Sequence, residues 1–243
     1  MSKPSVVLLH GVGLDHTVWE PLTAVAGSGF EVHTPDLPGH GASGPVAEGV
    51  TLADLAQHVA AGIPDGSHLL GFSLGALVAQ HLAIHRPELV ATLTSVSAVC
   101  RRTEAERAAV LGRLELAARD FTASCNASID RWFTGADVTE AWIERTRETL
   151  LANHVESFLR CYRVFATADA ELGPDLPRIT APALAITGED DAGSTPEMAH
   201  RLADAIPGCR VEVVPHARHM LPLERPDALA VALTALIGDH AHV

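Results

Sequence analysis

The pentapeptide Gly71-Phe72-Ser73-Leu74-Gly75 has the composition of a turn that presents a nucleophilic serine. It follows an apolar run at Leu69-Leu70 and precedes a helical pattern, so the segment is typical of a strand, a sharp turn and a helix. The flanking glycines tolerate a close approach of strand and helix and a strained backbone at the serine. Such a turn lifts the Ser73 hydroxyl to where a substrate carbonyl can reach it. Ordinary strand-to-helix turns share this pattern, so catalysis requires partners elsewhere in the chain.

Three other polar segments follow apolar strands in the same way. They are His10–Gly13 after residues 5–9, Gly188–Asp191 after residues 183–187, and His216–His219 after residues 210–214. The carboxyl ends of parallel strands meet at one edge of a sheet, where ligands bind in open α/β folds. A serine that undergoes acyl transfer needs a base, a carboxylate that orients the base, and N–H donors for the oxyanion. The three segments contain candidates for each role.

From about Val6 to Ile237 the chain resembles the α/β-hydrolase superfamily of serine hydrolases. The resemblance rests on the His10-Gly11-Val12-Gly13 loop, the Asp36–Ser43 segment, the Ser73 turn, and an acid and a histidine that follow the serine in that order. It implies an α/β fold with a mostly parallel sheet, helices on both faces and an inserted helical cap.

The resemblance also selects a base and an acid from neighbouring candidates. The family places the base shortly before a proline that opens the last helix, and Pro226 makes His219 fit this pattern better than His216. The family's spacing from the preceding glycine favours Asp191 over Asp190 as the acid.

The same resemblance implies an oxyanion hole formed by the backbone N–H groups of Val12 and Leu74. His10 is expected to orient the first of these two loops rather than to take part in the reaction.

The middle of the chain is similar to 3-oxoadipate enol-lactonases and related small esterases, through Arg131–Thr134 and Cys161–Phe165. Trp132 in this region is the candidate to line the substrate pocket. Three arginines could anchor a substrate carboxylate or simply face solvent, namely Arg131, Arg160 and Arg163.

The order of elements predicts six parallel strands. They are expected near residues 5–9, 30–34, 67–71, 90–97, 183–187 and 210–214. Residues 101–176 have helical spacing and no strand pattern, so we expect a helical cap there, between core segments 1–100 and 177–243. The amphipathic helices of this segment could instead form the face of a homodimer.

The composition is that of a compact soluble enzyme, with 243 residues of which 47% are hydrophobic. The net charge of −13 argues against nucleic acid or an anionic membrane as a partner. It also disfavours strongly anionic substrates, unless arginines gather at the site. The scattered cysteines, and the absence of a signal peptide or an apolar run of about 18 residues, favour a cytoplasmic protein.

A metal or another cofactor is not expected. The histidine pairs His81/His85 and His216/His219 lack the H-E-x-x-H form, and no nucleotide-binding glycine motif is present. The sequence therefore predicts a cofactor-free serine hydrolase that cleaves a small ester or lactone through an acyl-enzyme. The alternatives are hydrolysis of a C–C bond in a diketone-type substrate, and a non-catalytic small-ligand receptor on the same fold.

Overall fold

The computed structural model describes residues 3–240 and shows a six-stranded sheet in the order β2-β1-β3-β4-β5-β6. All five pairs of neighbouring strands are parallel, which confirms the predicted sheet. The strands are β1 (Ser5–Leu9), β2 (Glu31–His33), β3 (Ser67–Phe72), β4 (Val90–Val96), β5 (Ala183–Gly188) and β6 (Arg210–Val214).

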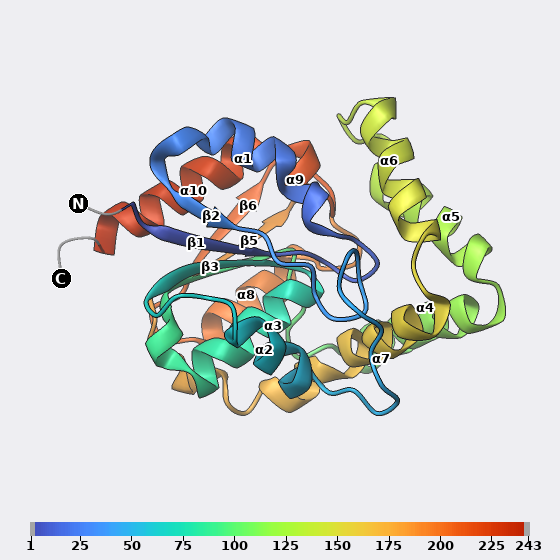
Figure 1. Ribbon diagram of the computed structural model, residues 1–243, viewed down its shortest axis with the longest axis horizontal. Coiled ribbons are helices and arrows are strands. Elements are labelled where there is room, and N and C mark those ends of the chain that lie inside the picture. Colours follow the sequence, from blue (N-terminus) through green and yellow to red (C-terminus); the bar gives the residue numbers. More distant parts are fainter. Residues whose placement is uncertain (1–2, 241–243) are drawn as a thin grey trace.

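Helices cover both faces of this sheet. Figure 1 shows α1 and α10 on one face and α2, α3 and α8 on the other. Their bounds are α1 (Glu20–Ala26), α2 (Leu52–Ala60), α3 (Leu74–His85), α8 (Pro196–Ala205), α9 (Leu221–Glu224) and α10 (Pro226–His240). Short 3-10 turns lie at His16–Trp19, Gly27–Gly29, Pro87–Leu89 and Leu176–Arg178. None of the helices within residues 3–240 is both long and apolar enough to cross a bilayer.

The central strands are buried almost along their whole length. Every residue of β5 is buried, and in β3 only His68 is partly exposed. In a parallel sheet covered on both faces, both sets of alternating side chains enter the core, so near-continuous apolar runs are the natural sequence for such strands. The edge strands β2 and β6 are more exposed, and their sequences contain both charged and apolar residues.

The chain leaves the sheet after β4 and returns at β5, and the intervening residues are helical. The helices are α4 (Glu104–Arg119), α5 (Phe121–Phe133), α6 (Glu140–Leu151) and α7 (Val155–Leu172). No strand lies within residues 101–176, all of which the structure describes. Figure 1 shows this α4–α7 segment beyond the carboxyl ends of the strands, at the edge where β1, β3 and β5 terminate.

A buried ion pair joins the first residues of the α4–α7 segment to α7. Arg102 Nη1 lies 2.8 Å from Asp169 Oδ1, and the two side chains are only 2% and 0% exposed. The Arg102 backbone N–H donates to Asp169 Oδ2 at 2.8 Å, and Arg102 Nη1 also donates to the Phe165 carbonyl at 3.1 Å. These contacts join the start of the segment to α7, near its end.

We expect Asp169→Asn to lower the free energy of unfolding by about 3 kcal/mol, because the change leaves the buried Arg102 charge without its counter-ion. Urea denaturation followed by circular dichroism measures this loss. Asp175→Asn is the matched control, since the Asp175–Arg178 pair is solvent-exposed and its loss should cost less than about 1 kcal/mol. Equal losses in the two variants would contradict the anchoring role of Asp169.

Candidate active site

Ser73 lies at the apex of the turn between β3 and α3. Its φ and ψ are 54° and −110°, a strained conformation for a residue with a side chain. A Cβ added at Gly71 would overlap the Gly75 carbonyl, and one added at Gly75 would overlap the Leu9 carbonyl. Both glycines are therefore required by the close passage of α3 against β3 and β1, as the sequence indicated. Ser73 is 4% exposed and borders the pocket described below.

His219 and Asp191 form a short hydrogen bond. His219 Nδ1 lies 2.7 Å from Asp191 Oδ2, and the other carboxylate oxygen accepts the N–H groups of Gly193 at 2.8 Å and Ser194 at 2.9 Å. Burial alone would raise the pKa of Asp191, but the His219 interaction and the two amides outweigh burial and hold the pKa below its usual value. The ionised carboxylate can only accept, so Nδ1 carries a hydrogen and Nε2 of the neutral ring is left as an acceptor.

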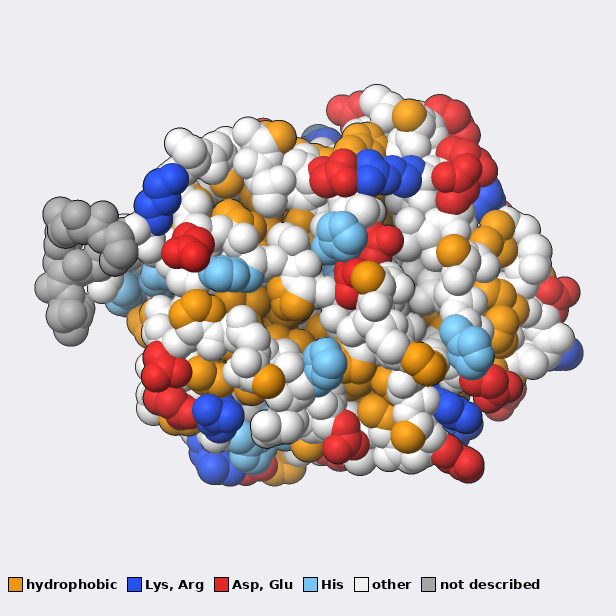
Figure 2. All heavy atoms as spheres, in the orientation of Figure 1, with side chains coloured by type: hydrophobic (Ala, Val, Ile, Leu, Met, Phe, Trp, Pro, Cys, Tyr) orange, Lys and Arg blue, Asp and Glu red, His pale blue; other side chains and the backbone are white. Residues whose placement is uncertain are grey.

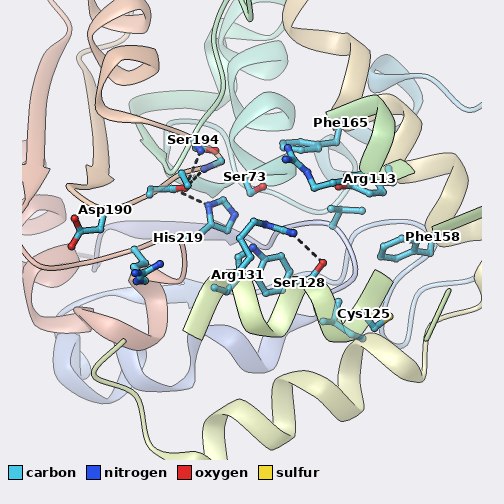
Figure 3. Close-up of a pocket in the computed structure, with 18 residues that line it drawn as sticks. Ser73, Arg113, Cys125, Ser128, Arg131, Phe158, Phe165, Asp190, Ser194 and His219 are labelled. Atoms are coloured by element: carbon cyan, nitrogen blue, oxygen red, sulfur yellow. Dashed lines mark hydrogen bonds and ion pairs between the residues drawn. The ribbon is translucent and has the colours of Figure 1, made fainter. Parts of the chain in front are cut away.

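The rival candidates lie outside this arrangement. The His216 side chain is 88% exposed, and its backbone N–H donates to Glu189 at the surface. Asp190 is exposed, and Figure 3 shows its carboxylate pointing away from His219. The structure therefore brings together His219 and Asp191, the pair that the sequence favoured.

A pocket at the carboxyl ends of the strands collects most of the predicted site residues. Its lining includes Ser73, Asp191, His219, Val12 and Trp132. The indole of Trp132 stacks on the His219 ring, with centroids 5.7 Å apart and an interplanar angle of 23°. Trp132 thus contacts the histidine as well as the pocket, which the sequence did not predict.

Leu74, the second residue expected to form the oxyanion hole, has a side chain that does not line the pocket. The side chain is fully buried in the core. Leu74 is also the first residue of α3, so its backbone N–H has no partner within the helix and stays available as a donor beside Ser73. Its expected role concerns only this N–H, so the buried side chain is compatible with it.

His10 holds the loop that carries Val12. Its ring is fully buried, Nε2 accepts the Leu37 N–H at 2.9 Å, and Nδ1 lies 2.8 Å from the Gly11 carbonyl. Burial lowers the pKa of His10, which favours the neutral ring that these two bonds require. This geometry matches the orienting role expected for His10.

Glu224 binds the backbone next to His219, a contact that the sequence did not reveal. Its buried carboxylate accepts the Arg218 N–H on Oε2 and the Met220 N–H on Oε1, both at 2.9 Å. These donors flank His219, so the carboxylate fixes the backbone on both sides of that residue. Burial raises the pKa of Glu224. The available signal was a glutamate five residues after the histidine, but a carboxylate that binds backbone N–H groups has no distinctive sequence pattern.

The arginines of the pocket were only partly anticipated. Of the three arginines for which the sequence left both a substrate role and a solvent-facing position open, Arg131 lines the pocket. Arg160 donates to a backbone carbonyl outside it, and Arg163 is exposed. Arg113 and Arg218, which the sequence did not single out, also line the pocket.

The residues present do not suggest a metal centre. Within residues 3–240, no group of three or more His, Cys, Asp or Glu side chains is arranged to hold a metal ion. The rings of His81 and His85 pack against each other, with centroids 4.3 Å apart.

Comparison with known proteins identifies the family of the chain. The family described as "Alpha/beta hydrolase family" matches residues 6–232. The chain belongs to the α/β-hydrolase family.

Two curated relatives show the chemistry found among similar sequences. The (E)-2-((N-methylformamido)methylene)succinate hydrolase of Acinetobacter baylyi is 30% identical over 234 residues, which cover 95% of this chain and 89% of that protein. The pimeloyl-[acyl-carrier protein] methyl ester esterase of Aromatoleum aromaticum is 32% identical over 251 residues, covering 98% and 99% of the two chains.

Solved structures extend the similarity. The enol-lactonase from Burkholderia xenovorans matches with a TM-score of 0.84 and 25% identity, over 98% of this chain and 92% of that one. A hydrolase from Pseudomonas aeruginosa matches with a TM-score of 0.85 and 27% identity, over 97% and 90%. These findings confirm the resemblance to α/β-hydrolases, and an enol-lactonase is among the similar structures.

We expect Glu224→Gln to lower kcat for a short aryl ester by about 10- to 100-fold, with little change in KM. Glutamine keeps the size of the side chain but offers one acceptor oxygen to two N–H groups, so the backbone around His219 loses one restraint. Steady-state kinetics with 4-nitrophenyl acetate measures the split between kcat and KM.

Glu189→Gln provides the matched control for this prediction. Glu189 also accepts a backbone N–H from the same loop, that of His216, but at the exposed surface. The control should retain nearly full kcat. A loss in Glu224→Gln that is confined to KM, or shared equally by both variants, would remove the positioning role.

Proposed function

We propose that the protein is a cofactor-free serine hydrolase that cleaves a small carboxylic ester or lactone through an acyl-enzyme. The observation that carries the proposal is the 2.7 Å bond between His219 and the buried Asp191, in a pocket that Ser73 also lines. This is the set of groups that covalent acyl transfer requires: a nucleophile, a base and a carboxylate that orients the base. The ester-cleaving and lactone-cleaving relatives support the substrate class.

In the proposed mechanism, Ser73 Oγ attacks the substrate carbonyl while His219 Nε2 takes the hydroxyl proton. Asp191 stabilises the imidazolium and holds the ring in the tautomer that keeps Nε2 free. The N–H groups of Val12 and Leu74 stabilise the oxyanion. The C–O bond to the leaving alcohol breaks as His219 donates the proton to that oxygen. Water, activated by the same histidine, then releases the acid and restores Ser73.

We assign the α4–α7 segment, residues 101–176, the role of a cap on a core formed by residues 1–100 and 177–243. Its residues Trp132, Leu150 and Phe158 form part of the pocket wall. An apolar wall of this kind excludes water from the acyl-enzyme and strengthens the polar interactions that stabilise the transition state.

A cytoplasmic location fits the cysteines of the chain. All four are free, and burial raises the pKa of the Cys161 thiol to about 12 and that of Cys100 to about 11. Free, unreactive thiols of this kind are typical of a reducing compartment.

The role of Ser73 leads to a direct prediction. We expect Ser73→Ala to lower kcat/KM for 4-nitrophenyl esters by at least about 10³-fold while leaving the circular dichroism spectrum unchanged, because the remaining groups cannot form the acyl-enzyme. A fluorophosphonate should label Ser73 in the unaltered protein, as read by peptide mass spectrometry. Labelling at a different serine would refute the assignment.

The assignments of the base and the acid are tested by two matched pairs of variants. We expect His219→Ala to lose nearly as much activity as Ser73→Ala, because the members of a triad act as a unit, whereas His216→Ala should be mild. Asp191→Asn should likewise cost at least about 10²-fold in kcat, and Asp190→Asn little. Steady-state rates on one ester rank the four variants. A reversed order within either pair would show that the wrong residue has been assigned.

A further inference from the structure

Three arginines border the pocket that holds Ser73. Arg113 comes from α4, Arg131 from α5, and Arg218 from the loop between β6 and α9. None of the three forms an ion pair with a carboxylate within residues 3–240, although many other arginines of the chain do. The pocket therefore contains positive charges that the described part of the chain does not neutralise.

Arg131 is held in place by neutral groups. Its Nη2 donates to Ser128 Oγ at 3.1 Å, and its guanidinium lies over the Trp132 ring at 5.7 Å from the centroid. Burial and the nearby charge of Arg113 lower the pKa of Arg131. Arg113 and Arg131 both border this pocket and are half-buried, and an unpaired charge is unfavourable in such a site. Figure 3 shows both around the same pocket as Ser73.

The two carboxylates that border the pocket do not satisfy these arginines. Asp191 is engaged by His219 and by two backbone amides. Asp190 is exposed and, in Figure 3, points away from the pocket.

The local charge also opposes the charge of the whole protein. The chain has 30 acidic against 17 basic residues, and Figure 2 shows acidic side chains spread over the visible face, several of them over α6. Unpaired arginines that gather beside a nucleophile on an acidic protein favour an anionic ligand over a neutral one. The planar fork of a guanidinium matches a carboxylate, to which it can donate two parallel hydrogen bonds.

We propose that the substrate carries a carboxylate, separate from the ester or lactone group that is cleaved, and that Arg113 and Arg131 bind this carboxylate. The inference rests on the proposed function, because it assumes that Ser73 attacks the substrate in this pocket. It narrows the substrate class to half-esters of dicarboxylic acids, lactones that bear a carboxylate, and esters of hydroxy acids.

Matched ester pairs test this proposal. One pair places the charge on the acyl side, mono-4-nitrophenyl adipate against its neutral methyl ester. The other places it on the alcohol side, 4-acetoxybenzoate against methyl 4-acetoxybenzoate. For at least one pair we expect kcat/KM to be about tenfold or more higher for the carboxylate than for the neutral partner, as befits a charge-assisted hydrogen bond.

Variants assign the preference to the arginines. Arg131→Met and Arg113→Met should each lower the charged-to-neutral ratio by about tenfold, and Arg131→Lys should retain part of it. Arg163→Met removes one positive charge from an exposed position of α7 outside the pocket, so it controls for net charge and should leave the ratio unchanged. Because the ratio is taken within each variant, a partial loss of folded protein cancels.

The outcomes separate this inference from the proposed function. If neutral esters are hydrolysed at Ser73 but both pairs show ratios near one, the carboxylate site is refuted and the serine mechanism stands. A carboxylate preference that survives in both Arg113→Met and Arg131→Met also refutes it. If no ester is turned over and Ser73 is not labelled by a fluorophosphonate, the proposed function itself fails.

Discussion

The turn at Ser73 depends on the close passage of three chain segments that only glycine permits. Gly71 packs against the Gly75 carbonyl, and Gly75 packs against the Leu9 carbonyl, so β3, α3 and β1 meet at the base of the turn. This contact holds Ser73 in a left-handed backbone conformation at the carboxyl edge of the sheet. The parallel order of the strands then brings the loops after β1, β5 and β6 to the same edge. The other groups of the candidate site lie on those loops.

The interactions around His219 have the character of a preorganised site. Asp191 binds one nitrogen of the ring, Trp132 and Phe72 pack against the ring, and Glu224 fixes the backbone on either side. In the proposed mechanism, a general base held in this way needs little reorganisation when charge develops during the reaction. The α4–α7 segment contributes the indole of Trp132 that stacks on His219 and two of the arginines that line the pocket, Arg113 and Arg131.

Those parts of the site that depend on local sequence could be predicted. The apolar runs indicated the positions of the strands, and the glycines around Ser73 marked the turn. The resemblance to α/β-hydrolases, through the position of Pro226, favoured His219 over His216. These features are encoded within about ten residues of each site. The parallel topology then brings the loops at the carboxyl ends of the strands together. The α4–α7 helices were likewise evident from their spacing and from the lack of any strand pattern.

Residues that act through distant contacts could not be predicted in this way. Arg113 and Arg131 lie on different helices, and which of their faces borders the pocket depends on how α4 and α5 pack on the core. The position of each side chain relative to the pocket had to be known before Arg131 could be distinguished from Arg160 and Arg163. Glu224 acts on backbone N–H groups, which carry no sequence signal. The negative net charge of the chain disfavours strongly anionic substrates, unless arginines gather at the site. Three arginines do line the pocket.

The central claim is that the reaction passes through an acyl group on the enzyme, and partitioning between water and methanol tests it most directly. Esters that share one acyl group but differ in their leaving alcohol should give the same ratio of free acid to methyl ester, because every one forms the same acyl-enzyme before water or methanol attacks. A ratio that changes with the leaving group, after correction for the uncatalysed reaction, would mean that water attacks the substrate directly, and it would contradict the account.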